Sequence, residues 1–103
     1  MSAIRIEKGS LVVPINPVIP YIMGDGIGRD ITPVMIRVID TAVEKAYGGV
    51  RRIKWLRVFA GDDALQEAGY TLDETLKLPE KERQRIYLPT ATIDALRLYK
   101  VSI

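Results

Sequence analysis

Residues 18–33 read VIPYIMGDGIGRDITP, and this stretch decides the fold. Its first part, residues 18–23, is a run of apolar, β-branched and aromatic side chains that stops abruptly at Gly24. Because apolar residues stand at successive positions, the run is typical of a strand buried on both faces, as in parallel sheets. The glycine-rich loop 24–28 follows the run. We therefore expect a buried strand that turns sharply into a second element.

The second element is predicted to be an amphipathic helix. Its apolar residues follow the i, i+3, i+4 spacing of a single stripe and are Ile31, Val34, Met35, Val38, Ile39, Ala42, Val43 and Ala46. Asp30 or Thr32 can cap the free amides at its start, Pro33 is tolerated in the first turn, and glycines 48–49 can end it. Residues 53–60 then have the pattern of a second strand. This order predicts a right-handed βαβ unit with parallel strands.

The rest of the chain predicts a single α/β domain over residues 1–103. Residues 1–16 are predicted to form an N-terminal flap, a β-hairpin that turns at Lys8-Gly9-Ser10. A short helix is expected over 61–69, a last helix after Leu88-Pro89-Thr90, and the start of a strand at 101–103. Residues 70–88 are the least regular part, with a capping-box pattern at Thr71 and Glu74 and many charges. We expect 70–88 to be a surface insertion.

Composition excludes several classes of protein. The chain has 103 residues, of which 48% are apolar and 27% charged, which indicates one globular domain at most. It contains no Cys and no His, so disulfides, thiol nucleophiles, His-based triads and His-based zinc sites are excluded. The formal charge of +2 is too small to gather nucleic acid, and prolines interrupt the apolar stretch 11–23, so it is not a membrane span. We expect a cytoplasmic protein with neither nucleic-acid nor membrane partners.

The glycine loop admits two interpretations. Free amides and the positive end of a helix dipole suit an anion such as a phosphate. However, the dinucleotide fingerprint G-x-G-x-x-G needs a third glycine at position 29, where this sequence has Arg29. The alternative is that the glycines only turn the chain sharply. The residues alone leave both interpretations open.

A resemblance to a known family bears on the function of the glycine loop. Residues 16–33 resemble the opening of the metal-dependent β-decarboxylating dehydrogenases, the isocitrate/isopropylmalate dehydrogenase family, and above all its NADP-dependent isocitrate dehydrogenases. Residues 43–49 and 88–97 look like later segments of the same family, and 9–14 look like the flap that precedes the first strand of isocitrate dehydrogenases. The resemblance implies a partial isopropylmalate dehydrogenase-like large domain, of which this chain is the N-terminal part.

The family oxidises and decarboxylates isocitrate to 2-oxoglutarate with NADP and Mg²⁺ or Mn²⁺. Its substrate-binding arginines, metal-binding aspartates, catalytic Tyr and catalytic Lys lie beyond the segment that this chain resembles. The resemblance therefore implies that the chain carries no catalytic or metal-ligating residue, needs no cofactor of its own, and is inactive alone. Consistent with this, we interpret the neighbouring acids Asp62-Asp63 and Asp73-Glu74 as surface charge, because neighbours in sequence point apart.

What the resemblance does transfer is one wall of the cofactor cleft. In the family the side chain of the loop isoleucine lies near the adenosine part of the dinucleotide. Ile27 is therefore the candidate cofactor contact, and Gly26 is the residue that allows the approach. The competing interpretation is that Ile27 packs against the helix while Asp25 ties the loop together by accepting backbone amides.

Two further functions remain open. Unpaired strand edges or an uncovered apolar helix face would make the chain a self-associating module, and we expect a homo-oligomer through one of these surfaces. The glycine loop could also make it a small stand-alone nucleotide-binding domain.

Overall fold

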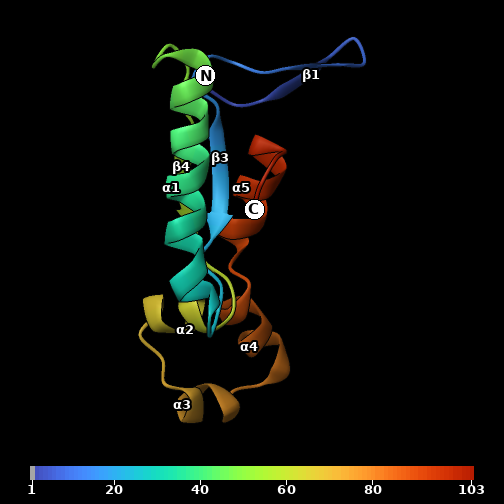
Figure 1. Cartoon of the computed structure of the whole chain (residues 1–103). Helices are drawn as coiled ribbons and strands as arrows, with labels where there is room; N and C mark the ends of the chain where they lie inside the picture. The colour runs from blue at the N-terminus through green and yellow to red at the C-terminus, as the bar shows by residue number, and fades with distance from the viewer. Residues whose placement is uncertain (1) are drawn as a thin grey trace.

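The computed structural model describes residues 2–103 and has the α/β architecture that the sequence predicts (Figure 1). Met1, the first residue of the predicted domain and flap, lies outside the described residues. In chain order the elements are β1 Arg5–Glu7, β2 Ser10–Val12, β3 Val18–Ile22, α1 Gly28–Tyr47, β4 Lys54–Val58, α2 Asp62–Glu67, α3 Leu72–Leu76, α4 Glu80–Tyr87 and α5 Thr90–Tyr99.

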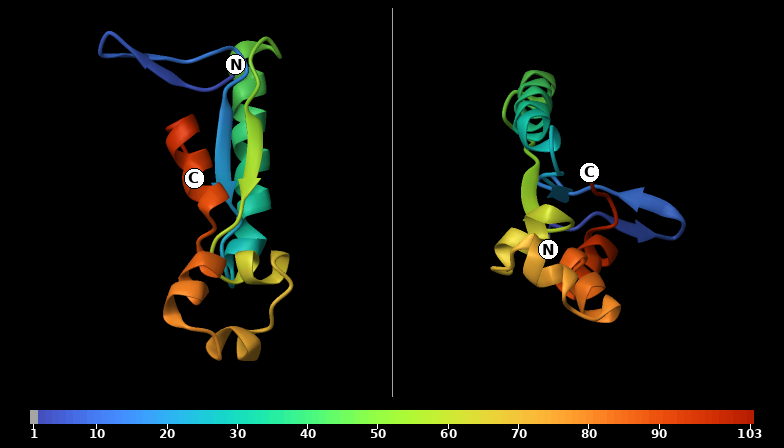
Figure 2. Two further views of the ribbon diagram at one scale, coloured as in Figure 1. Left: turned by 180° about the vertical axis from the view of Figure 1, so that it is seen from behind. Right: turned by 90° about the horizontal axis from the view of Figure 1, so that it is seen from below.

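A parallel βαβ unit forms the centre of the molecule. β3 and β4 pair in parallel, with Val18 opposite Lys54 and Ile22 opposite Val58, and α1 connects them. α1 lies on one face of this strand pair and α5 on the other, so the centre has three layers (Figure 2). The predicted strand–loop–helix–strand order with parallel strands is confirmed.

Ile103 pairs with β3 on the edge that β4 leaves free. The Ile103 amide donates to the Pro20 carbonyl oxygen at 3.1 Å, and the Ile22 amide donates to the Ile103 carbonyl oxygen at 2.8 Å. One residue makes these two bonds when it pairs with a parallel strand. Residues 101–103 are not a full strand, but Ile103 pairs with β3 as a strand residue would, as the predicted strand start implies. β3 therefore has β4 on one edge and Ile103 on the other.

The helix α1 ends as predicted but begins differently. Gly48 adopts a left-handed conformation, φ 59°, and its amide donates to the Glu44 carbonyl oxygen, which confirms the glycine end. Neither Asp30 nor Thr32 caps the start, so that prediction is wrong. The helix begins at Gly28, before both residues, because the glycine loop completes its turn early. The hydroxyl of Thr32 instead donates to the Met23 carbonyl oxygen at 2.7 Å, tying the first turns of α1 to the end of β3.

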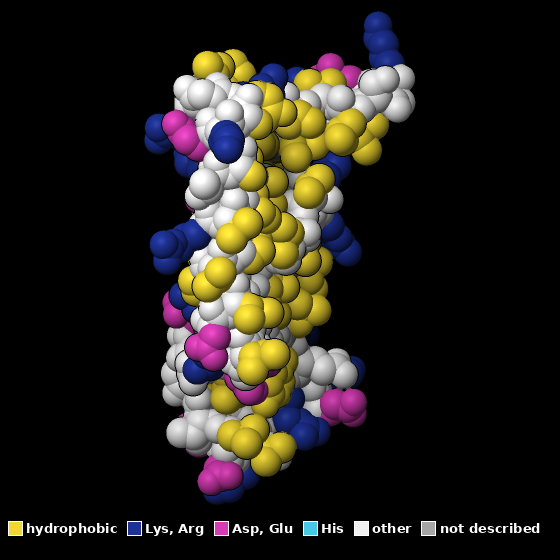
Figure 3. Space-filling view, viewed as in Figure 1, with side chains coloured by type: hydrophobic (Ala, Val, Ile, Leu, Met, Phe, Trp, Pro, Cys, Tyr) yellow, Lys and Arg dark blue, Asp and Glu magenta, His cyan; other side chains and the backbone are white. Residues whose placement is uncertain are grey.

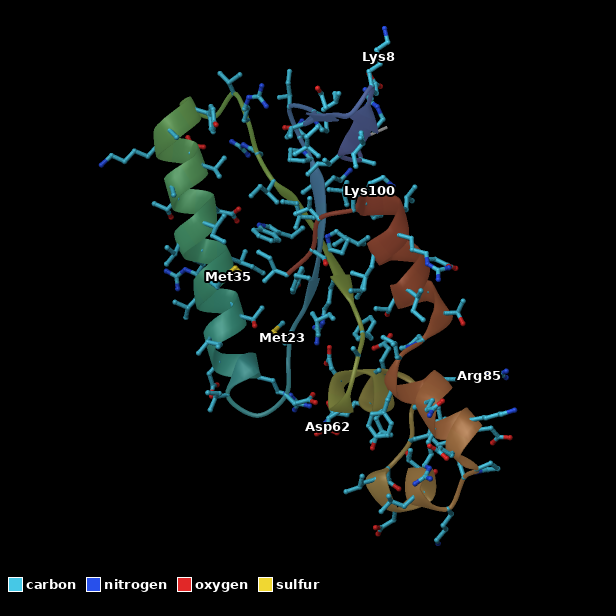
Figure 4. All side chains as sticks on the ribbon, turned by 90° about the vertical axis from the view of Figure 1, so that its right-hand side faces the viewer. Lys8, Met23, Met35, Asp62, Arg85 and Lys100 are labelled. Carbon is cyan, nitrogen blue, oxygen red and sulfur yellow. The ribbon has the colours of Figure 1, made fainter. Side chains whose placement is uncertain are left out.

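Burial is lower than the sequence predicts. In β3 only Pro20 is fully buried and its neighbours are half-buried, so the expectation of a strand buried on both faces is met only there. The apolar residues of α1 also differ in how far they are buried. Met35 points toward the strands (Figure 4), whereas Ile31, Val34 and Val38 are exposed. A pair of strands is too narrow to cover an apolar stripe that spans so much of a helix.

The β1–β2 hairpin is confirmed. Ile6 lies opposite Leu11 in an antiparallel register, and the turn residues Lys8 and Gly9 both have positive φ, 49° and 77°. Positive φ at both central positions marks the type I′ turn, whose twist suits a two-residue hairpin loop. The hairpin projects away from the βαβ unit (Figure 1).

Residues 62–87 fold into α2, α3 and α4 at the opposite end of the molecule (Figure 1). The short helix predicted over 61–69 is confirmed as α2. The Thr71 hydroxyl accepts from the Glu74 amide at 3.2 Å and donates to its carboxylate at 3.0 Å, so Thr71 and Glu74 cap α3 together as predicted. That residues 70–88 are an insertion stays a prediction. No helix within residues 2–103 is both long enough and apolar enough to cross a membrane.

Replacing Thr32 with valine tests the link between β3 and α1. Thr32→Val keeps the shape of this nearly buried side chain but leaves the Met23 carbonyl without its donor. We expect the free energy of unfolding, measured by urea denaturation at low protein concentration, to fall by about 1–1.5 kcal/mol. The matched control is Thr41→Val, which removes an exposed hydroxyl bond to the Arg37 carbonyl and should change stability by less than about 0.5 kcal/mol. Equal losses from the two variants would contradict the assignment.

Candidate functional site

The glycine loop 24–28 meets the start of α2 at one end of the sheet. Because β3 and β4 are parallel, their carboxyl ends lie at the same edge, and the loops that follow them come together there. Figure 4 shows Met23, after β3, and Asp62, at the start of α2, at this end of the strands. This is the edge at which open α/β sheets bind ligands.

A single carboxylate joins the two loops. The Asp62 amide donates to both carboxylate oxygens of Asp25, at 3.1 and 3.2 Å. Asp25 therefore accepts a backbone amide, as one interpretation of the sequence predicts, but the amide comes from α2 and not from its own loop. The bond fixes the glycine loop relative to β4 and α2.

Gly61 makes this approach possible. A Cβ atom placed on Gly61 would lie 2.5 Å from Oδ2 of Asp25, and its φ of 68° is a conformation that side chains disfavour. The glycine at position 61 is thus required twice, by its backbone angle and by the neighbouring carboxylate. Nothing in the sequence alone links it to Asp25, which is far from it along the chain.

The backbone amides at the start of α1 are already used. Gly28 donates to the Asp25 carbonyl at 2.9 Å, Arg29 to Gly26 at 3.4 Å, and both Asp30 and Ile31 to Ile27 at 2.9 and 3.0 Å. A phosphate cradle requires such amides to be free. The geometry of residues 28–31 therefore favours the interpretation in which the glycines turn the chain.

The two predicted cofactor-binding residues are both open to contact. Ile27 is 75% exposed and stands at the N-cap of α1, so it does not pack against the helix as the competing interpretation holds. A Cβ on Gly26 would meet no atom within 4 Å. Gly26 also lines an open pocket together with Arg29, Asp62, Leu65, Gln66, Tyr70, Thr71 and Leu72. The structure thus brings Gly26 and Ile27 to a ligand-accessible surface, and the cofactor contact itself stays a prediction.

An ion pair behind this site was missed by the sequence analysis. The Arg57 guanidinium lies 2.7 Å from Oδ1 of Asp63, whose residue is only 6% exposed. The prediction that Asp63 is surface charge is therefore wrong, whereas Asp62, Asp73 and Glu74 are exposed as predicted. Adjacent helical residues point in different directions, which turns Asp63 inward while Asp62 faces solvent. The pair anchors the first turn of α2 to β4 and so holds the Asp62 amide in place.

No part of residues 2–103 brings together three or more His, Cys, Asp or Glu side chains that could hold a metal ion.

A parallel βαβ unit with a glycine loop at the carboxyl edge of its strands is compatible with part of an α/β dehydrogenase domain. No protein-family model matches the chain. Curated proteins do match it. The chain is 51% identical over 94 residues to isocitrate dehydrogenase [NADP] of Pseudomonas aeruginosa (strain UCBPP-PA14), which is 91% of this chain and 19% of that protein.

Two other relatives give the same picture. Isocitrate dehydrogenase [NADP] 1 of Colwellia maris is 48% identical over 97% of this chain and 21% of its own length. Isocitrate dehydrogenase [NADP] of Archaeoglobus fulgidus is 43% identical over 86% of this chain and 21% of its own length. The chain is therefore related to the NADP-dependent isocitrate dehydrogenases, which confirms the resemblance, and it spans about a fifth of the length of these relatives.

Alanine at position 61 tests the joint between the two loops. Gly61→Ala places a methyl group against Asp25 in a backbone conformation that is essentially restricted to glycine, and we expect a loss of about 2–3 kcal/mol in the free energy of unfolding. Gly26→Ala is the matched control, since that residue also has positive φ but faces open space, and it should cost about 1 kcal/mol. Adding Asp25→Ala to Gly61→Ala should recover part of the loss. The joint is not as described if positions 26 and 61 are equally sensitive.

The ion pair between Arg57 and the buried Asp63 has a fully exposed counterpart in the same chain. Arg57→Met leaves the Asp63 carboxylate buried without its cation, and we expect unfolding to become easier by about 2 kcal/mol in chemical denaturation. Arg5→Met removes the exposed pair with Glu7, which has a distance of 3.0 Å, and should change stability by less than about 0.5 kcal/mol. A near-zero effect at Arg57 would show that Asp63 does not depend on it.

Proposed function

We propose that this chain supplies the N-terminal part of the large α/β domain of an NADP-dependent isocitrate dehydrogenase in the cytoplasm. The intact enzyme would oxidise and decarboxylate isocitrate to 2-oxoglutarate with NADP and Mg²⁺ or Mn²⁺. The supporting observation is the 51% identity over 91% of the chain to an enzyme of that name. In this proposal residues 1–103 form one folded unit, 1–16 its flap and 70–88 a surface insertion.

The chain's own contribution is one wall of the cofactor cleft. Ile27 offers an exposed apolar side chain to the adenosine part of NADP, and Gly26, which has no Cβ, leaves room for the approach. Asp25 holds the loop in position through the Asp62 amide. Since the amides of residues 28–31 are engaged, the phosphates of the cofactor would be held by other parts of the enzyme.

The reaction needs groups that this proposal places elsewhere. The carboxylates of the substrate are best bound by arginines that pair with them. The divalent ion needs several acidic ligands, and the proton transfers need a positioned acid and base. In this proposal the residues for these tasks belong to the rest of the enzyme, since the chain matches only about a fifth of each relative. The chain alone should therefore fold without turning over isocitrate.

An assay with two arms tests the proposal. In the first, the purified chain is given isocitrate, NADP and Mg²⁺, and NADPH is followed by its absorbance, with the Pseudomonas aeruginosa relative as positive control. We expect no production above the blank, and clear turnover by the chain alone would refute the proposal. In the second, the position of that relative aligned with Ile27 is changed to alanine. Loss of an apolar contact of about 1–2 kcal/mol should raise KM for NADP about 5–30-fold with KM for isocitrate unchanged.

The stand-alone nucleotide-binding domain is the weaker candidate. It rests on the glycine loop, whose neighbouring amides at residues 28–31 donate to the protein's own carbonyls. The self-associating module is favoured by the exposed apolar side chains of Ile31, Val34 and Val38 on α1.

A further inference from the structure

Asp25 and Gly26 form a sequence pair with a chemistry of its own. In an aspartate followed by glycine, the amide nitrogen of the glycine can attack the carboxyl carbon of the aspartate side chain, because no Cβ shields that nitrogen. The product is a cyclic imide, a succinimide, which water reopens either to aspartate or to isoaspartate. In isoaspartate the main chain runs through the side-chain carbon.

The glycine loop holds the only such pair in the sequence. The single asparagine, Asn16, precedes Pro17, whose nitrogen carries no hydrogen and cannot take part. Every other aspartate is followed by a residue with a side chain and lies inside a helix, which restrains its backbone. These aspartates are Asp30, Asp40, Asp62, Asp63, Asp73 and Asp94. The sequence and the fold therefore confine this chemistry to Asp25.

The structure leaves the attacking nitrogen accessible. Asp25, Gly26 and Ile27 are all exposed, and Figure 3 shows acidic side chains open to solvent at this end of the molecule. In the part of the chain that the structure describes, the Gly26 amide donates no hydrogen bond, whereas the Gly28 and Arg29 amides donate to carbonyl oxygens of the loop. The nitrogen is thus unoccupied in a loop whose other amides are engaged.

The Asp25 carboxylate, in contrast, is restrained by the fold. Both of its oxygens accept the Asp62 amide, at 3.1 and 3.2 Å, which directs the carboxylate toward α2. Closure of the ring requires the carboxyl carbon of Asp25 to contact the Gly26 nitrogen. The bond to the Asp62 amide must therefore break before the side chain can turn to that nitrogen.

We propose that Asp25 is a modification site at which the chain converts slowly to isoaspartate, and that the Asp25–Asp62 hydrogen bond limits the rate of conversion. The site goes beyond the proposed function, because the chemistry depends only on the glycine loop and α2. It does not require that the chain belong to an active enzyme.

The conversion needs no reactant except water. The Gly26 nitrogen forms a bond to the carboxyl carbon of Asp25 and gives up its proton, and that carbon loses a hydroxyl group, so one water leaves. A second water then attacks the main-chain carbonyl carbon of Asp25. The bond from this carbon to the Gly26 nitrogen breaks, and the nitrogen takes the electron pair and a proton. The isoaspartate that results has the same mass as the original residue.

Conversion would release the joint between the glycine loop and α2. The main chain gains a methylene group between residues 25 and 26, and the free carboxylate now stands directly on the α carbon. A carboxylate moved in this way no longer meets the Asp62 amide in the original geometry. The loop that ends at Ile27 then loses its connection to α2, and with it the position that the proposed cofactor contact requires.

Ageing of the purified full chain at neutral pH and body temperature tests the site. Trypsin releases residues 9–29 as one peptide, in which electron-transfer fragmentation and isoaspartyl methyltransferase detect isoaspartate. We expect isoaspartate at Asp25 to accumulate at least about tenfold faster than at Asp73, a difference of about 1.4 kcal/mol in activation free energy. Asp73 is the internal control, because it is also exposed but precedes Glu74. Equal rates at the two residues, or no isoaspartate at Asp25, would overturn the proposal.

Alanine at position 26 tests the attacking group. Gly26→Ala adds a methyl group next to the nitrogen, and no atom lies within 4 Å of the added carbon. We expect conversion at Asp25 to slow about tenfold. Because alanine is strained at the φ of 56° found here, the variant should loosen the loop, which by itself would speed the reaction. A decrease therefore reports shielding of the nitrogen, and an unchanged rate would show that this nitrogen is not the attacking group.

Proline at position 62 tests the hydrogen bond. Position 62 is the first residue of α2, where proline is tolerated, so Asp62→Pro removes the amide hydrogen that Asp25 accepts while keeping the helix. We expect conversion to become about 10–150-fold faster, which corresponds to about 1.5–3 kcal/mol, the range for a hydrogen bond to a charged group. The matched control Asp62→Ala keeps the amide and removes only the exposed side chain, and its rate should stay within about twofold of the original.

A second variant keeps this test decisive if Asp62→Pro does not fold, which circular dichroism will show. Arg57→Met loosens the first turn of α2 but leaves both partners of the hydrogen bond in place, so it should also speed conversion. Arg5→Met, which removes the exposed pair with Glu7, should not. If the folded variants among Asp62→Pro and Arg57→Met convert no faster than Asp62→Ala, the hydrogen bond does not limit the rate and the proposal is wrong on that point.

Discussion

The contact between the Asp25 carboxylate and the Asp62 amide holds together the end of the sheet on which the candidate site is built. It joins the loop after β3 to the helix after β4, two segments that the parallel strands bring to one edge but do not connect. The absence of a side chain at Gly61 gives the carboxylate room, and the ion pair of Arg57 with the buried Asp63 holds α2 to β4. These constraints together determine where Ile27 stands.

The narrowness of the sheet accounts for the second major property of the molecule. Two paired strands, with Ser2 and Ile103 each hydrogen-bonded to β3, give α1 a small area to cover. The half of its apolar residues that includes Met35 and Ile39 packs toward the strands, while Ile31, Val34 and Val38 remain in contact with solvent. A helix with apolar residues around so much of its circumference is typical of one that other parts of a protein cover on its outer side.

Local features of the fold were predictable from the sequence, and contacts between distant segments were not. The turn at Lys8-Gly9, the end of α1 at Gly48 and the cap of α3 at Thr71 depend on residues within one turn of each other, and all three are confirmed. The start of α1 was predicted wrongly because the glycine loop completes its turn early and the helix begins at Gly28, which places Thr32 inside it, bonded to the Met23 carbonyl. Asp63 was misjudged for a similar reason, since its burial depends on Arg57 reaching it from β4. The site residues Gly26 and Ile27 came from the family resemblance, and their exposure is consistent with it.

Ile27 ends the glycine loop at the N-cap of α1 and is 75% exposed. Further along the same helix Val34 and Val38 are exposed as well. The relatives are about five times as long as this chain, so in the proposed enzyme additional segments are available to cover α1. Segments that cover Val34 and Val38 must stop short of Ile27 if its side chain is to contact the cofactor. The free energy that favours covering the apolar residues of α1 and the requirement for an open cofactor cleft therefore act in opposite directions at this one isoleucine.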